Sequence, residues 1–184
     1  MKNQLITITV TGIIIFIWQF CTWGLLNLHA DEFKYSPNQD AILNALNANL
    51  TEDGNYYMPT LPMDASHEQH EAAMKANMGK PWAMVKYHKV ADFSMGMNMF
   101  RGFVVDLFAA FLLIWLLMQF RETSFKTVMM SSLGIGFIGY LVITYTNSIW
   151  FDTNTMMYFV DTIVLWGLVG AWLGWWLNRG QANG

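Results

Sequence analysis

Long apolar stretches alternate with polar segments along this chain. The clearest lies between Arg101 and Arg121 and has 19 residues, in which Asp106 is the one charged position. At about 1.5 Å of rise per residue, a helix of that length is roughly 28 Å long, close to the hydrocarbon thickness of a bilayer. The stretch therefore predicts a membrane-spanning helix over about 99–120.

Three further stretches, 5–28, 127–146 and 156–177, have the same character. The first carries no charge, is longer than the apolar region of a cleaved signal peptide, and is followed by no small-x-small cleavage site. We therefore expect an uncleaved helix there. The last stretch carries Asp161, and the whole pattern predicts four spanning helices.

The polar segment 29–98 contains signals for short helices. Residues 36–39 and 66–69 both match the capping box, in which a serine and a glutamine three residues later satisfy the N–H groups of a helix start. Gly79 should end the second helix, and 56–62 should be extended because residues before proline avoid the helical region. Two short helices cannot bury a core alone, so this segment is expected to lean on the helix ends or the membrane surface.

Positive charge favours one orientation across the membrane. Lys2, Arg121, Lys126 and Arg179 flank the spans on one side, and the positive-inside rule makes that side cytoplasmic. The 147–155 loop on the other side has no Lys or Arg. Both termini are therefore predicted to be cytoplasmic, with the polar segment outside.

These elements predict an all-α fold, an integral membrane four-helix bundle with a small, mainly helical exterior insertion between helices 1 and 2. The expected division is 1–28 for helix 1, 29–98 for the insertion, and 99–184 for helices 2–4 with a short cytoplasmic tail. Composition agrees, since 54% of residues are hydrophobic and 12% charged, against about 25% charged in soluble domains. The net charge of −3 without a basic run argues against a nucleic-acid partner, and the single Cys21 excludes an intramolecular disulfide.

Two aspartates are the first candidates for chemistry. A charge within the hydrocarbon costs about 2.5–3.5 kcal/mol, so Asp106 and Asp161 need partners. Each lies about five residues past the outer boundary, at a shared depth of roughly 7–8 Å. Thr22, and Thr144 or Tyr145, should lie at the same level and complete a polar layer in the outer half.

Arg101 is the nearest cation to Asp106 in the sequence. Five residues at 100° each place the two side chains about 140° apart around one helix, so Arg101 is better aimed at a neighbouring helix or the headgroups. The small neighbours of Asp106, among them Gly102 and Ala110, indicate that the aspartate points into the bundle. Three readings stay open: Asp106 locks the helices together, it is a solvated aspartate at the interface, or Arg101, Asp106, Asp161 and Tyr145 handle a proton, a cation or a ligand.

A soft-metal site is a second, weaker candidate. His67 and His70 lie one turn apart, and Met95, Met97 and Met99 precede a span. Thioethers and imidazoles suit copper, and further donors occur in the same exterior region at His29, His88, Met74, Met78 and Met84. Ordinary packing of methionines and solvation of histidines explain the same residues without a metal.

Glycines in the last two spans predict close helix contacts, because small residues let helices approach each other. Whether these contacts lie within the bundle or join another subunit is open at this stage. The glycines concerned are Gly134, Gly136, Gly139, Gly167, Gly170 and Gly174.

No nucleophile–base pair, phosphate loop or metalloprotease motif occurs in the sequence. The leading hypothesis is thus a non-enzymatic membrane protein, a structural or accessory component that contacts the lipid bilayer and itself or another membrane protein. The alternative is a transport or binding protein for a cation, a proton or a small solute entering from outside. A periplasmic copper-binding protein and a membrane enzyme are less favoured hypotheses.

One resemblance extends over most of the chain. The pattern Pro37-Asn38-x-Asp40-Ala41-Ile42, with Ala45-Leu46, Gly54-x-Tyr56 and Pro59-x-x-Pro62 after it, stands between a first span and three more. This layout resembles a set of uncharacterised bacterial four-span membrane proteins. The resemblance implies a bacterial inner membrane and a periplasmic insertion, and it implies no activity or site residues.

Overall fold

The computed structural model describes residues 2–121 and 123–179, which form two compact units. The helical unit comprises Met1–Lys34 and Ser94–Gly184, and the inserted unit comprises Tyr35–Phe93. The short tail predicted at the C-terminus lies, from residue 180 onward, outside the described residues. Each unit is taken by itself below.

Four helices of the helical unit are long and apolar enough to cross a membrane, which agrees with the predicted number of spans. They are α1 (Lys2–Phe20) with a π-helical turn at Cys21–Leu25, α4 (Met95–Leu117), α5 (Phe125–Gly139) continued by a π-helical segment (Tyr140–Tyr145) and α6 (Thr146–Phe151), and α7 (Met156–Asn178). The chain is thus a multi-pass membrane protein by helix length and composition.

The third span is longer than the sequence predicted. Its helix continues through the expected loop to Phe151 and ends where Asp152 adopts a left-handed conformation, with φ 48°. Aspartate tolerates this conformation better than most residues, and a left-handed residue is a common helix end. The connection to α7 therefore shrinks to four residues, 152–155.

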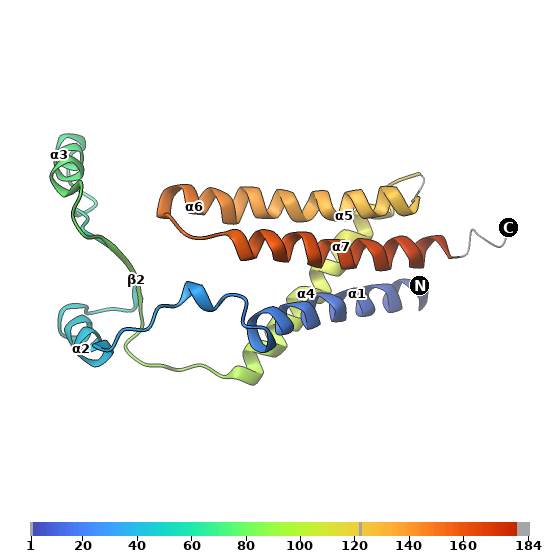
Figure 1. Ribbon diagram of the computed structural model, residues 1–184, viewed down its shortest axis with the longest axis horizontal. Helices are drawn as coiled ribbons and strands as arrows, with labels where there is room; N and C mark the ends of the chain where they lie inside the picture. The colour runs from blue at the N-terminus through green and yellow to red at the C-terminus, as the bar shows by residue number, and fades with distance from the viewer. Residues whose placement is uncertain (1, 122, 180–184) are drawn as a thin grey trace. The chain divides into compact units, whose positions relative to one another are not determined.

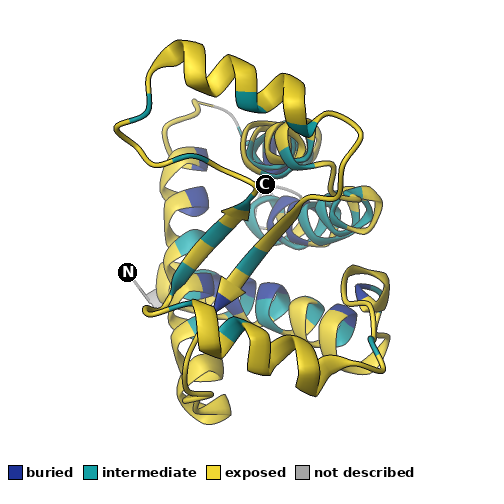
Figure 2. Cartoon of the chain, turned by 90° about the vertical axis from the view of Figure 1, so that its left-hand side faces the viewer, coloured by how far each residue is buried: buried dark blue, intermediate teal, exposed yellow. Residues whose placement is uncertain are grey.

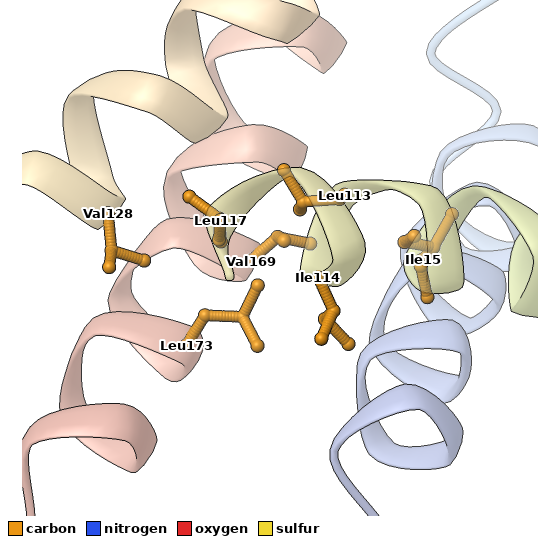
Figure 3. Close-up of a cluster of buried hydrophobic side chains, with 8 residues drawn as sticks. Ile15, Leu113, Ile114, Leu117, Val128, Val169 and Leu173 are labelled. Carbon is orange, nitrogen blue, oxygen red and sulfur yellow. The ribbon is translucent and has the colours of Figure 1, made fainter. Parts of the chain in front are cut away.

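A shared apolar core joins all four spans. The helix α5 lies along α7, and α1 contacts both α4 and α7. Figure 3 shows core side chains converging from the four helices: Ile15 from α1, Leu113, Ile114 and Leu117 from α4, Val128 from α5, and Val169 and Leu173 from α7. Ala110 of α4 is buried in the same cluster. Apart from Ile15, near the middle of its span, these residues lie in the half of the bundle that contains the α4–α5 turn. We call this the inner half, and the opposite half the outer half, after the orientation predicted from charge.

Three of the predicted glycines lie at the contact between α5 and α7. A Cβ built on Gly136 would overlap the indole of Trp166, and one on Gly170 would lie 3.1 Å from the Met129 Cα. A Cβ built on Gly174 would lie 2.7 Å from Cδ2 of the Phe125 ring. These contacts lie within the chain. The other three, Gly134, Gly139 and Gly167, have no such neighbour within 4 Å.

The inserted unit contains two helices and a two-stranded sheet. Its elements are α2 (Gln39–Asn49), β1 (Gly54–Met58), α3 (His67–Asn77) and β2 (Ala83–Tyr87). The strands are antiparallel, with Gly54 opposite Tyr87 and Met58 opposite Ala83. The sequence predicted extended chain at the first strand but not its pairing, so the mainly helical, all-α description was incomplete. Cross-strand pairs such as Tyr56 opposite Val85 join β-branched and aromatic side chains, which stabilise such a pairing.

One of the two predicted capping boxes is confirmed. Ser66 Oγ accepts a hydrogen bond from the Gln69 backbone N–H at 3.3 Å, and Gln69 Oε1 accepts from the Ser66 N–H at 2.8 Å. The prediction for Ser36 was wrong, since Asn38 is the N-cap of α2 and Ser36 Oγ accepts from the Asn38 N–H instead. A serine that bonds the backbone two residues ahead forms a turn rather than a helix start.

The inserted unit buries little of itself. Within Tyr35–Phe93, all of which the structure describes, Tyr87 is the one buried residue, and its hydroxyl donates to Asn47 Oδ1 at 2.9 Å. Figure 2 shows the helices α2 and α3 coloured largely as exposed. This agrees with the expectation that two short helices build no core of their own.

Gly136→Ala should destabilise the helical unit by about 1–3 kcal/mol, because the added methyl group overlaps the Trp166 indole in a packed contact. Gly134→Ala on the same helix is the matched control and should be neutral or slightly stabilising, since alanine favours helix over glycine. Thermal unfolding in detergent micelles, followed by circular dichroism, measures both. Equal midpoints for the two variants would contradict the α5–α7 contact.

Candidate functional site

A buried histidine lies at the outer end of the helical unit, between two carboxylates. The His29 residue is 2% exposed. Its Nδ1 lies 2.5 Å from Glu32 Oε1, and its Nε2 lies 2.8 Å from Asp161 Oδ2. Both ring nitrogens therefore face an acidic oxygen, and one of these carboxylates belongs to α7.

Two further side chains donate hydrogen bonds to the remaining oxygens of these carboxylates. The Trp18 indole N–H donates to Asp161 Oδ1 at 3.2 Å, and the Tyr158 hydroxyl donates to Glu32 Oε2 at 2.8 Å. Each of the four carboxylate oxygens thus has a partner. We call His29, Glu32, Tyr158 and Asp161 the outer network.

Aromatic rings cover the imidazole. The Trp23 indole stacks on His29 with the ring centroids 4.1 Å apart and an interplanar angle of 4°, and the Tyr158 ring lies 4.8 Å from His29 at a tilt of 57°. The two rings shield the imidazole from water. Stacking of this kind also favours a cationic imidazole over a neutral one.

The end of α1 turns the chain so that His29 reaches α7. After the π-helical turn at Cys21–Leu25, Asn27 adopts a left-handed conformation with φ 48°, and the Leu28 N–H donates to the Thr22 carbonyl at 2.9 Å. Asparagine is among the few residues that tolerate this conformation. The chain therefore folds back over the helix end instead of leaving it directly.

The carboxylates raise the pKa of His29. Burial by itself lowers this pKa, but the hydrogen bonds and negative charges of Asp161 and Glu32 outweigh it. The folded protein thus holds the imidazolium form to higher pH than a free histidine, whose pKa is about 6.5.

The second aspartate has a separate partner. Asp106 is 3% exposed, and its Oδ1 accepts a hydrogen bond from Gln19 Nε2 at 3.2 Å. Its Oδ2 has no partner among the described residues. Asp106 therefore points into the bundle, as expected, and its hydrogen-bond partner Gln19 belongs to α1.

The other residues that the sequence predicted to handle a ligand, Arg101 and Tyr145, do not belong to the outer network. Arg101 is exposed and makes no ion pair within the described ranges. Tyr145 is 48% exposed and lies against the Tyr140 ring, at a centroid distance of 6.2 Å. Thr22 is buried near Gln19, whose carbonyl accepts its hydroxyl hydrogen at 3.2 Å.

The predicted copper ligands fall in two units. His67 and His70 belong to α3 of the inserted unit, whereas Met95, Met97 and Met99 occupy the first turns of α4 in the helical unit and are exposed. In the part of the chain that the structure describes, no group of three or more His, Cys, Asp or Glu side chains is arranged to hold a metal ion.

Two clefts adjoin the outer network and share Tyr158. The first, of about 640 Å³, is lined by Asp31, Glu32, Lys34 and Asp152 together with the residues around the α6–α7 connection. The second, of about 390 Å³, lies between α1, α5 and α7, with Asp161 and Trp18 in its wall. The outer network therefore contributes Glu32 to an acidic cleft and Asp161 to a more apolar one.

Known proteins provide no template for this site. No protein-family model, curated protein or solved structure matches the chain. Sequence reasoning missed Trp18, Gln19, Glu32 and Tyr158. Gln19 carried a usable signal, because a polar side chain within a span generally finds an interhelical hydrogen bond. Nothing local in the sequence indicates that Glu32 folds back onto α7.

His29→Gln should lower the stability of the protein by about 1–3 kcal/mol at pH 6, where the imidazolium bonds both carboxylates. Because the folded-state pKa is raised, this contribution is fully present below about pH 6.5 and is lost as the pH rises through the raised value. The difference in thermal midpoint between wild type and variant should therefore shrink from pH 6 to pH 9.

His88→Gln is the matched control for this titration, since His88 pairs with Asp53 at 3.1 Å but is exposed. Its midpoint should differ little from that of wild type at either pH. A His29→Gln effect that is independent of pH would contradict the assignment of an imidazolium to the outer network.

Proposed function

We propose that the protein is a non-enzymatic integral membrane protein of a bacterial inner membrane, a structural or accessory component whose outer half is held together by its intramembrane carboxylates. One observation carries this proposal. Trp18 and Gln19 are consecutive on α1 and donate to Asp161 on α7 and to Asp106 on α4. Consecutive helical residues point about 100° apart, so α1 bonds two different helices at one level.

The free-energy cost of a carboxylate in the membrane supports a structural role for the two aspartates. A carboxylate in hydrocarbon is costly unless hydrogen bonds compensate it, and a partner removed there is not replaced by water. The Asp161 carboxylate is compensated on both oxygens, by Trp18 and by His29. These bonds favour one arrangement of α1 against α7 over the alternatives.

The inner half supports the same conclusion. Leu117, Val128 and Leu173 are fully buried there and belong to three different spans. A proton or ion that entered the outer half would meet this apolar core before the other surface. A single copy of the chain is therefore better suited to structural support than to transport.

The proposed topology rests on charge. The side of the membrane that is predicted to be cytoplasmic carries Lys2, Arg121, Lys126 and Arg179. The α6–α7 connection on the other side carries no positive charge. This arrangement supports a periplasmic location for the inserted unit. The proposed relation to bacterial four-span proteins rests on the exterior pattern that begins at Pro37.

A second candidate function is binding of a small cation or cationic solute at the outer surface. The observation in its favour is the cleft of about 640 Å³ in which Asp31, Glu32 and Asp152 face a single Lys34. An excess of carboxylates in a concave site attracts cations.

Asp106→Asn should leave the thermal midpoint unchanged or raise it, because the amide oxygen still accepts from Gln19 and a neutral amide replaces a buried carboxylate. Asp106→Leu is the matched variant and should cost about 1–3 kcal/mol, since it leaves the Gln19 amide without its acceptor. Thermal unfolding in detergent micelles measures both. A large loss of stability in Asp106→Asn would contradict the structural role.

Liposomes containing the purified protein and a pH-sensitive or cation-sensitive dye test transport directly. The structural proposal expects no proton or cation flux above that of empty liposomes, and Asp161→Asn should behave like wild type. Flux in wild type that disappears in Asp161→Asn would overturn the proposal. Cation binding to the protein in detergent micelles that disappears in Asp152→Asn but persists in Asp161→Asn would favour the second candidate.

A further inference from the structure

The inserted unit contains a cleft of about 630 Å³ that the functions proposed above do not use. It lies between α3 and the segments that flank the two strands. Its wall includes His70, Met74, Met78 and Trp82. The cleft therefore brings an imidazole, two thioethers and an indole to one place.

Helical spacing places the first three donors along one side of the cleft. His70, Met74 and Met78 follow one another at intervals of four residues, and side chains at i and i+4 lie on the same face of a helix. Met74 is central and has one partner a turn away on each side. Met78 caps the C-terminus of α3, beyond its last helical residue.

These donors are not engaged elsewhere. His70 makes no side-chain hydrogen bond or ion pair among the described residues, whereas the other three histidines each have a carboxylate within 3.8 Å. Met74 and Met78 are 65% and 76% exposed. Methionine is unbranched and flexible, so both thioethers can turn toward a common centre without disturbing packed structure.

The chemistry of the cleft selects a soft monovalent cation. No carboxylate lines the cleft within the described residues, and its one charged residue is Lys80. Ca²⁺ and Mg²⁺ need oxygen ligands, and Zn²⁺ favours thiolates or several imidazoles. Thioethers together with one imidazole suit Cu(I), and the low charge of Cu(I) limits its repulsion by Lys80.

The indole of Trp82 adds a further contact. Its ring lies 5.8 Å from the Tyr57 ring, at an interplanar angle of 35°, and half of the residue is exposed. The face of an indole attracts a cation placed over it. We propose that His70, Met74 and Met78 bind Cu(I) in this cleft, with Trp82 beside the ion.

Competition for Cu(I) tests the proposal on the full-length protein in detergent micelles. Anaerobic titration against the chromophoric chelator bicinchoninate should show one Cu(I) bound per chain. Met74→Leu, which conserves volume and lies at an exposed position, should weaken Cu(I) binding at least about tenfold, and His70→Gln should do the same. Circular dichroism of each variant should match that of wild type.

Met97→Leu is the matched control, because Met97 is an exposed methionine of the α4 cluster in the helical unit. It should bind Cu(I) as wild type does. A wild-type protein that retains no Cu(I), or a Met74→Leu variant of unchanged affinity, would overturn the proposal. Loss of binding in Met97→Leu would overturn it too and assign the copper to the methionines of α4.

A second readout separates the indole from the thioethers. Ag(I) is a redox-inert analogue of Cu(I), and its binding should quench part of the tryptophan fluorescence of wild type. Trp82→Phe should lose this quenching while the ion remains bound to the other three residues. Quenching that is unchanged in Trp82→Phe would contradict the position of the ion beside the indole.

Discussion

A carboxylate within a bilayer must find its hydrogen-bond donors inside the protein, and two neighbouring residues of α1 supply them here. Trp18 bonds Asp161 and Gln19 bonds Asp106, so a single turn of α1 connects to both α7 and α4. Water cannot substitute for either donor at that depth. The positions of three of the four spans in the outer half therefore depend on these two interactions. The fourth span, α5, is held differently, through the close glycine contacts with α7.

The parts of the fold that could be predicted from the sequence depend on neighbouring residues. Span number follows from the length of apolar stretches, and the start of α3 follows from Ser66 and Gln69. The pairing of β1 with β2 was missed because it joins segments about 30 residues apart along the chain, and such pairings leave a weak local signal. For the candidate site, the inward direction of Asp106 was predicted from its small helical neighbours, and the burial of its side chain agrees. The partners of both aspartates were not predicted, because tertiary packing selects them.

The bundle has two halves that differ in chemistry. The inner half packs mainly aliphatic side chains, although Thr7, Thr11 and Ser132 are also buried there, and such packing is non-directional and tolerates conservative exchange. The outer half consists of directional hydrogen bonds between the aspartates, His29, Trp18 and Gln19. The helical unit therefore combines directional hydrogen bonds in its outer half with mainly apolar packing in its inner half.

The outer network also lies where the chain leaves the membrane. The inserted unit begins at Tyr35, three residues after Glu32, whose two oxygens are bonded to His29 and Tyr158. At its other end, the unit rejoins the helical unit at Ser94, which caps α4 by accepting from the Met97 N–H. One connection is thus held by a titratable network and the other by a helix cap that does not titrate. The two ends of the inserted unit thus adjoin different kinds of interaction, a buried network of charged groups before Tyr35 and a single helix cap after Phe93.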